Sequence, residues 1–144
     1  MAQNRQPIWP KEPNTGVDNA TTMAPTLTTA AADYTGISAN NQLVATGGAD
    51  GTLIMGLRFI PLGTNVATVA RIYFNDGSDP TVATNNEIIG KISLPATTAS
   101  NTSAEAEVVW PWGELLKSPS RLYVGLGTTV AAGWRVTKID AKNF

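Results

Sequence analysis

Along residues 53–75, apolar residues alternate with other residues, and this alternation constrains the fold more than any other feature of the chain. An apolar residue at every second position is typical of a β-strand with one buried face. A loop from Pro61 to Ala67 separates two such runs, so the sequence predicts a β-hairpin here. The side chains expected to face the core are Leu53, Met55, Leu57, Phe59, Ala70, Ile72 and Phe74. The residues expected on the opposite face, a candidate contact surface, are Ile54, Arg58, Val69, Arg71 and Tyr73.

Short segments of the same kind recur on both sides of the hairpin, with turn-forming residues between them. These further expected strands are 34–37, 43–46, 87–94, 105–110, 121–126 and 133–139. Residues 111–119 are bounded by prolines and are expected to form at most one helical turn. About eight short strands without a long helix predict an all-β fold, either a jelly roll or a β-sandwich. Its core is expected to contain Phe59, Ile72, Trp110 and Trp134.

The first 32 residues differ in composition from the rest of the chain. They hold four of the nine prolines and a tract rich in threonine and alanine at 21–32. Such a segment neither continues as a helix nor buries much surface by itself. It is either a disordered tail or an arm held by the body or by a neighbouring subunit, with the aromatic Trp9 as its expected anchor. We therefore expect an extended arm at 1–32 and a jelly-roll or sandwich domain at 33–144.

The chain contains neither cysteine nor histidine. Without them it has no disulfide, no thiolate metal site, no Ser-His-Asp or Cys-His arrangement and none of the usual zinc ligand sets. These exclusions favour a binding or structural role over an enzyme, and we expect neither a cofactor nor a metal.

Ten basic residues stand against eleven acidic ones, giving a formal net charge of -1, and the basic residues are scattered. A surface that binds a nucleic acid duplex needs clustered positive charge, so nucleic acid is not an expected partner. The apolar runs are far shorter than the ~20 residues needed to cross a bilayer. The N-terminus lacks the apolar segment of a signal peptide. We expect a soluble protein made in a cytoplasm, with no membrane partner.

Two pairs of carboxylates are candidates for chemistry. Asp76 and Asp79 can supply oxygen ligands to calcium, but their spacing does not fit an EF-hand, so a turn closed by aspartate side chains is the preferred interpretation. Glu105 and Glu107 lie two apart on an expected strand and therefore point the same way. Glycosidases place their two acids on facing elements, so a solvated or partner-facing strand is preferred for this pair.

The aromatic residues offer a candidate platform for stacking a sugar ring. Trp110 and Trp134 share the parity of apolar neighbours, so core packing explains them, and Trp112 is the tryptophan of this group expected to be free. The other aromatics considered for the platform are Tyr73 and Tyr123.

Two parts of the chain resemble a known family. They are RFIPLGTN at 58–65 continuing to RIYFN at 71–75, and LYVGLGT at 122–128 continuing to GW at 133–134. Together with the Pro/Thr/Ala arm and the strand-rich body, they are similar to the small head proteins of tailed bacteriophages, in particular capsid decoration, or cement, proteins. The resemblance covers roughly residues 33–144.

The resemblance implies a body that sits as a dimer or trimer on the outside of a phage head, after synthesis in the host cytoplasm. There it would clamp neighbouring subunits of the major capsid protein. The contact residues, which we infer from parity and composition, are Trp9, Arg58, Arg71, Tyr73, Tyr123 and Arg135. The main alternative is a carbohydrate- or receptor-binding β-module of a phage tail or fibre.

Overall fold

The computed structural model describes residues 12–13, 24–31, 37–139 and 142–143, and this part of the chain is almost entirely β-structure. Its strands are β1 Glu12–Pro13, β2 Thr26–Leu27, β3 Gln42–Thr46, β4 Thr52–Pro61, β5 Thr68–Asn75, β6 Asn86–Leu94, β7 Val108–Leu116, β8 Arg121–Leu126, β9 Trp134–Ile139 and β10 Lys142–Asn143. The helical segment within the described residues is one short 3-10 turn, Ala83–Asn85, and none of their helices has the length or apolar character to cross a membrane.

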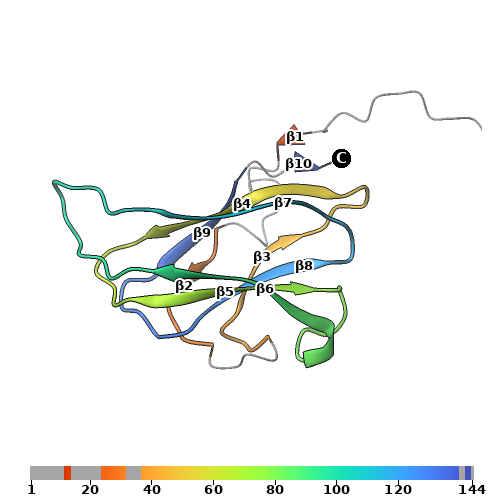
Figure 1. Ribbon diagram of the computed structural model, residues 1–144, viewed down its shortest axis with the longest axis horizontal. Coiled ribbons are helices and arrows are strands. Elements are labelled where there is room, and N and C mark those ends of the chain that lie inside the picture. Colours follow the sequence, from red (N-terminus) through yellow and green to blue (C-terminus); the bar gives the residue numbers. More distant parts are fainter. Residues whose placement is uncertain (1–11, 14–23, 32–36, 140–141, 144) are drawn as a thin grey trace, which may run out of the picture.

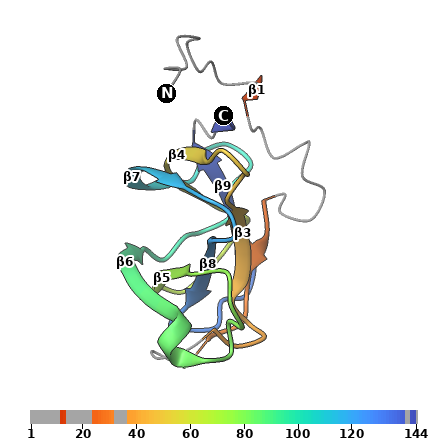
Figure 2. The ribbon, with the colours of Figure 1, turned by 90° about the vertical axis from the view of Figure 1, so that its right-hand side faces the viewer.

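The strands form two antiparallel sheets packed face to face (Figures 1 and 2). Sheet A has the order β2-β9-β4-β7, and β10 and β1 extend it at one end beside β4. Sheet B has the order β3-β8-β5-β6. The pairs β2·β9, β3·β8, β4·β7 and β5·β6 are nested, as when one long hairpin is rolled up on itself. This is the jelly-roll arrangement of an eight-stranded double sheet, and the expected all-β class is confirmed.

The hydrophobic core lies between the two sheets and draws on strands of both. Phe59, Ile72 and Trp134 are fully buried in it, as expected. Trp110 is half-buried, because it lies on the edge strand β7, where the two sheets are open to solvent.

The alternation in β4 breaks at a β-bulge, and two expectations fail there. Met55 was expected in the core but is 45% exposed, and Ile54 was expected outside but is fully buried. The register with β7 shifts between Ile54 and Gly56, so burial changes parity at that point. On β7 the bulge is accommodated by Gly113, whose φ of 97° lies in the region that favours glycine.

Strand β7 also differs from the expectation at both ends. It begins at Val108 rather than at residue 105, and it continues through Pro111 to Leu116, where the sequence predicted a turn. An edge strand tolerates proline because only one of its sides must hydrogen bond. β7 pairs with β4 alone among the described strands.

The expected boundary between arm and body at residue 32 is placed too late in the chain. Strand β2 pairs with β9, and its Leu27 is a buried member of the hydrophobic core. Ala31 is also buried, and its N–H donates a hydrogen bond to the carbonyl of Leu126 at 2.8 Å. Residues 24–31 therefore belong to the body. Trp9 lies outside the described residues.

Candidate interaction surfaces

The outer side of sheet A presents exposed apolar side chains. Along β4 and its neighbours, Arg58 lies opposite Val109 of β7 and Thr137 of β9, on the side away from the core. Exposed Met55 of β4 and exposed Leu115 of β7 point to the same side of the sheet, since the opposite side is buried. We call this surface the sheet A face; its residues are Met55, Arg58, Ile60, Val109, Pro111, Leu115, Arg135 and Thr137.

The charged residues of the sheet A face are two arginines, Arg58 and Arg135. Arg58 Nε lies 3.5 Å from Glu107 Oε2, and the two side chains are 46% and 48% exposed. An ion pair this exposed contributes at most about 1 kcal/mol to folding. Arg135 is exposed on β9 opposite Ile60. The face therefore offers a partner mainly apolar contact, with arginines within it.

The predicted contact residues on sheet B are less exposed than those on the sheet A face. Arg71 and Tyr73 are on the side away from the core, as parity predicted, but only 6% and 1% of their surfaces are exposed. The expectation that they are open to a partner is therefore wrong. Tyr123 lies directly opposite Tyr73 on β8 and is half-buried.

The cover over sheet B comes from the chain itself. The guanidinium of Arg71 donates a hydrogen bond from Nη1 to the carbonyl of Ala31 at 2.8 Å. A β-carbon on Gly125 would lie 2.6 Å from the Asn41 side chain and 3.0 Å from that of Ala31. In the connection from β2 to β3, Ala31 and Asn41 therefore pack against the outer side of this sheet.

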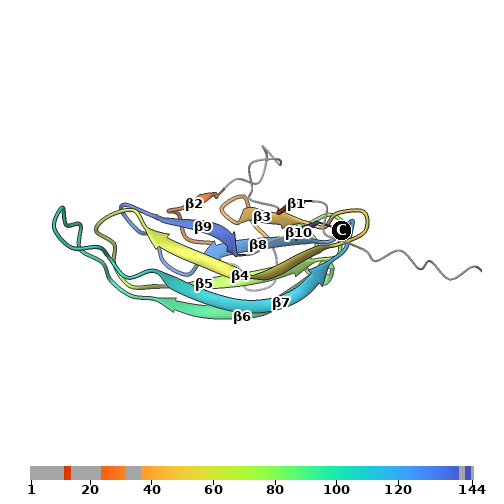
Figure 3. The same ribbon diagram turned by 90° about the horizontal axis from the view of Figure 1, so that it is seen from above.

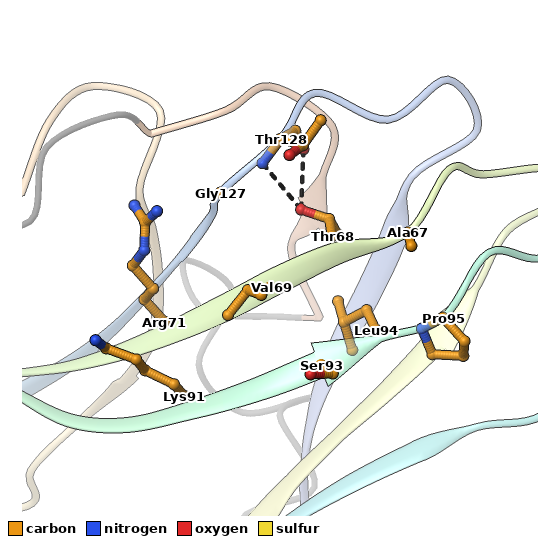
Figure 4. Close-up of a pocket in the computed structure, with 10 residues that line it drawn as sticks. All are labelled: Ala67, Thr68, Val69, Arg71, Lys91, Ser93, Leu94, Pro95, Gly127 and Thr128. Carbon is orange, nitrogen blue, oxygen red and sulfur yellow. Dashed lines mark hydrogen bonds between the residues drawn. The ribbon is translucent and has the colours of Figure 1, made fainter.

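A shallow depression of about 800 Å³ remains on sheet B beside this cover (Figure 4). Arg71 of β5 and Lys91 of β6 lie opposite each other at one end of it. At the other end, the Thr68 hydroxyl donates to the carbonyl of Thr128 and accepts from its N–H. The hydroxyl of Thr68 and the Nη1 of Arg71 are thus engaged within the protein, and we assign no ligand to this depression.

The open side of the sandwich between β6 and β7 carries two tryptophans. The rings of Trp110 and Trp112 are stacked, with centroids 6.1 Å apart and an interplanar angle of 23°. Trp110 lies over Gly90 of β6, where a β-carbon would come within 2.6 Å of the indole. Trp112 was expected to be free but is half-buried in this stack. Beside it is a cavity of about 570 Å³ lined by Phe74, Glu87, Ile88, Ile89, Trp112, Glu114 and Leu115.

Asp76 and Asp79, the carboxylates considered for metal binding, each close a turn of the backbone. Asp76 Oδ1 accepts the N–H of Ser78 at 2.8 Å, and Asp79 Oδ1 accepts both the hydroxyl and the N–H of Thr81. Both hydrogen bonds lower the pKa of the Asp79 carboxyl, and the bond from the Thr81 hydroxyl has the larger effect. The part of the chain that the structure describes contains no group of three or more acidic, histidine or cysteine side chains placed to hold a metal ion.

One further titratable group is affected by burial. Lys138 on β9 lies opposite Leu57, and desolvation lowers the pKa of its ammonium group.

Of the predicted contact residues, the structure brings Arg58 and Arg135 together on the sheet A face and leaves both exposed. Sequence reasoning missed Met55 and Leu115. Met55 was missed because the bulge reverses parity, and Leu115 because its segment was read as a turn. Whether any of these residues meets a partner stays a prediction.

Comparison with protein-family models, with curated proteins and with solved structures gives no match to this chain.

Proposed function

We propose that the protein is a structural virion protein that decorates the outside of a phage head. In this proposal it clamps neighbouring subunits of the major capsid protein and contacts copies of itself. The observation that carries the proposal is the sheet A face, where Met55 of β4 and Val109 and Leu115 of β7 are exposed. Exposed apolar side chains gathered on one surface are typical of protein interaction sites.

Composition supports the same function. Only 15% of the residues are charged, which leaves much of the surface to apolar and small residues that a partner can cover. A protein without cysteine also cannot undergo thiol oxidation, which suits a particle that persists outside cells. Jelly rolls occur in viral capsid proteins, but this last point is an analogy at the level of the fold.

The test replaces one apolar side chain on the sheet A face by a charge. Val109→Asp places a carboxylate at the partner surface, while Arg58 directly opposite makes the charge tolerable in the free protein. We expect at least about tenfold weaker binding to undecorated heads, the loss typical of an important interface residue. The measurement is occupancy on the heads against protein concentration.

The matched control is Val82→Asp. Val82 is 45% exposed, close to the 49% of Val109, but it lies in the connection between β5 and β6, away from the sheet A face. The Val82→Asp protein should bind heads as the wild type does. Equal binding by all three proteins would remove the sheet A face from the contact, and binding of none of them to heads would contradict the proposal itself.

The stacked tryptophans favour a second candidate, a carbohydrate- or receptor-binding module of a tail or fibre. Aromatic faces provide apolar area on which a sugar ring can stack. The carboxylates of Glu87 and Glu114, beside Trp112, can accept hydrogen bonds from the hydroxyls of the sugar. This candidate predicts glycan-array binding that Trp112→Ala abolishes. Decoration predicts no glycan binding and co-purification with intact heads.

A further inference from the structure

The open side of the sandwich holds a cavity that combines aromatic and acidic side chains. Edge strand β6 of sheet B and edge strand β7 of sheet A run along the same side of the molecule (Figures 2 and 3). The cavity of about 570 Å³ beside Trp112 lies here, and we call it the Trp112 slot. Its apolar lining is Phe74, Ile88, Ile89, Trp112 and Leu115, and its acidic lining is Glu87 and Glu114.

The two carboxylates of the Trp112 slot have no basic partner in the part of the chain that the structure describes. Glu87 and Glu114 are exposed, and the ion pair between described residues is Arg58–Glu107, outside the slot. Among the described residues that line the slot there is no lysine and no arginine. The complement of such a site is a segment that carries positive charge together with apolar rings.

The N-terminal residues of the chain have this complementary composition. Residues 1–11 contain two basic residues, Arg5 and Lys11, and no acidic one. Two prolines and Trp9 lie between these two charges. Proline-rich segments bind grooves lined with aromatic side chains, because their extended conformation is preformed and costs little entropy to fix. The positive charges of this segment therefore match the two carboxylates of the slot in number, and its apolar rings match the aromatic lining.

The register of β1 indicates which copy of the chain supplies the segment. Through β10, Glu12 of β1 is level with Thr52, the first residue of β4. A chain extended backwards from Glu12 in the direction of β1 therefore leaves sheet A at the end where β4 begins. Glu114 of the slot lies opposite Ile54, further along β4 from that end. The N-terminal segment would have to reverse direction to enter the slot of its own chain, whereas the slot of a second copy requires no reversal.

We propose that two copies of the chain exchange their N-terminal segments, with residues 5–11 of each copy bound in the Trp112 slot of the other. The apolar residues of the segment pack against Trp112, and Arg5 and Lys11 pair with the two carboxylates. Because the exchange is reciprocal, it closes as a two-fold symmetric dimer. The inference rests on the part of the proposed function in which the protein contacts copies of itself, and it names the residues that make this contact.

The test reverses the charges on each side of the contact in the full chain. The arm variant carries Arg5→Glu and Lys11→Glu, and the slot variant carries Glu87→Lys and Glu114→Lys. In either variant alone the segment and the slot have charges of the same sign. We therefore expect a dimer Kd at least about tenfold larger than that of the wild type, as the loss of several exposed ion pairs should cause. Sedimentation velocity over a range of protein concentrations measures the dimer Kd.

A mixture of the two variants decides between exchange and other contacts. In the mixture, the acidic segment of the arm variant meets the basic slot of the slot variant, and the basic segment of the slot variant meets the acidic slot of the arm variant. We expect a heterodimer with roughly the wild-type Kd, although each variant alone dimerises weakly. A wild type that remains monomeric at millimolar concentration, or a mixture that dimerises no better than its two components, would overturn the proposal.

Glu107→Lys is the matched control for the change in charge, because Glu107 is an exposed glutamate next to β7 but outside the slot. It should dimerise as the wild type does. An equal loss of dimer in this control would show that net charge, rather than the Trp112 slot, governs association, and it too would overturn the assignment. Formation of the heterodimer itself shows that both charge-reversed variants are folded. The assay contains no phage heads, so its failure is distinct from a failure to bind heads.

Discussion

Trp134 is the largest of the fully buried side chains in the described part of the chain. It begins β9, where it lies opposite Leu27 of β2 and Pro61 of β4. Trp134→Ala should reduce the free energy of unfolding by about 3–5 kcal/mol, because it leaves a cavity in the core that the neighbours cannot fill. Chemical denaturation measures the loss.

Trp134→Phe is the matched control for this change. The indole N–H of Trp134 has no hydrogen-bond partner among the described residues, so phenylalanine removes an unsatisfied polar group while keeping most of the apolar volume. It should lose clearly less stability than alanine. A loss below about 1 kcal/mol for alanine, typical of a surface position, would contradict the burial of Trp134.

The burial of a single residue could be predicted where it depends only on which side of its own sheet the residue lies. Phe59 and Ile72 follow that rule, and both are in the core. Arg71 and Tyr73 do not, because their outward direction was predicted correctly but their cover was not. That cover includes Ala31, forty positions before Arg71, and alternation within one strand carries no information about such a distant contact.

Whole elements depart from the sequence expectation where the backbone departs from regular alternation. One extra residue on β7 reverses the parity of burial in β4, although both strands continue. Strand β2 is two residues long, so it contains no alternation from which to predict it. Its place in sheet A follows from pairing with β9, more than a hundred positions away.

Strand β2 also determines how much of the N-terminal arm can be deleted without loss of stability. Deleting residues 1–23 keeps β2 and should leave the Tm within a few degrees of the full chain, since the deletion spares Leu27 and Ala31. Deleting residues 1–31 removes both buried side chains and should unfold the body or lower its Tm strongly. Circular dichroism on heating compares the three proteins.

A point change separates the loss of Leu27 from the loss of chain length. Leu27→Ala in the full chain should reduce stability by about 2–5 kcal/mol, as truncation of a buried leucine does. The exposed neighbour gives the control, since Thr26→Ala should have little effect. Full stability after deletion of residues 1–31 would show that β2 is dispensable and restore the boundary at residue 32.

At the scale of the whole molecule, strand positions were predictable and strand pairing was not. Alternation and turns are local, so they mark where most strands run. The nested order of the jelly roll depends on contacts between distant segments, such as β3 with β8, for which one sequence gives no signal. The surfaces on the two outer sides depend in turn on that order, which is why the sheet A face became visible only in the folded protein.

The balance of charge over the whole molecule yields a last prediction. The net charge is -1, and the sheet A face combines exposed apolar side chains with the Arg58–Glu107 pair and the exposed Arg135. Salt screens charges but hardly weakens apolar contact, so the affinity for heads should change by less than about threefold between 0.05 and 0.5 M NaCl. Occupancy on heads, measured at fixed protein concentration near half saturation, reports the change. A steep fall with salt would mean that charges such as Arg58 and Arg135 carry the contact, and Arg135→Ala should then bind weakly at every salt concentration while Val109→Asp binds normally.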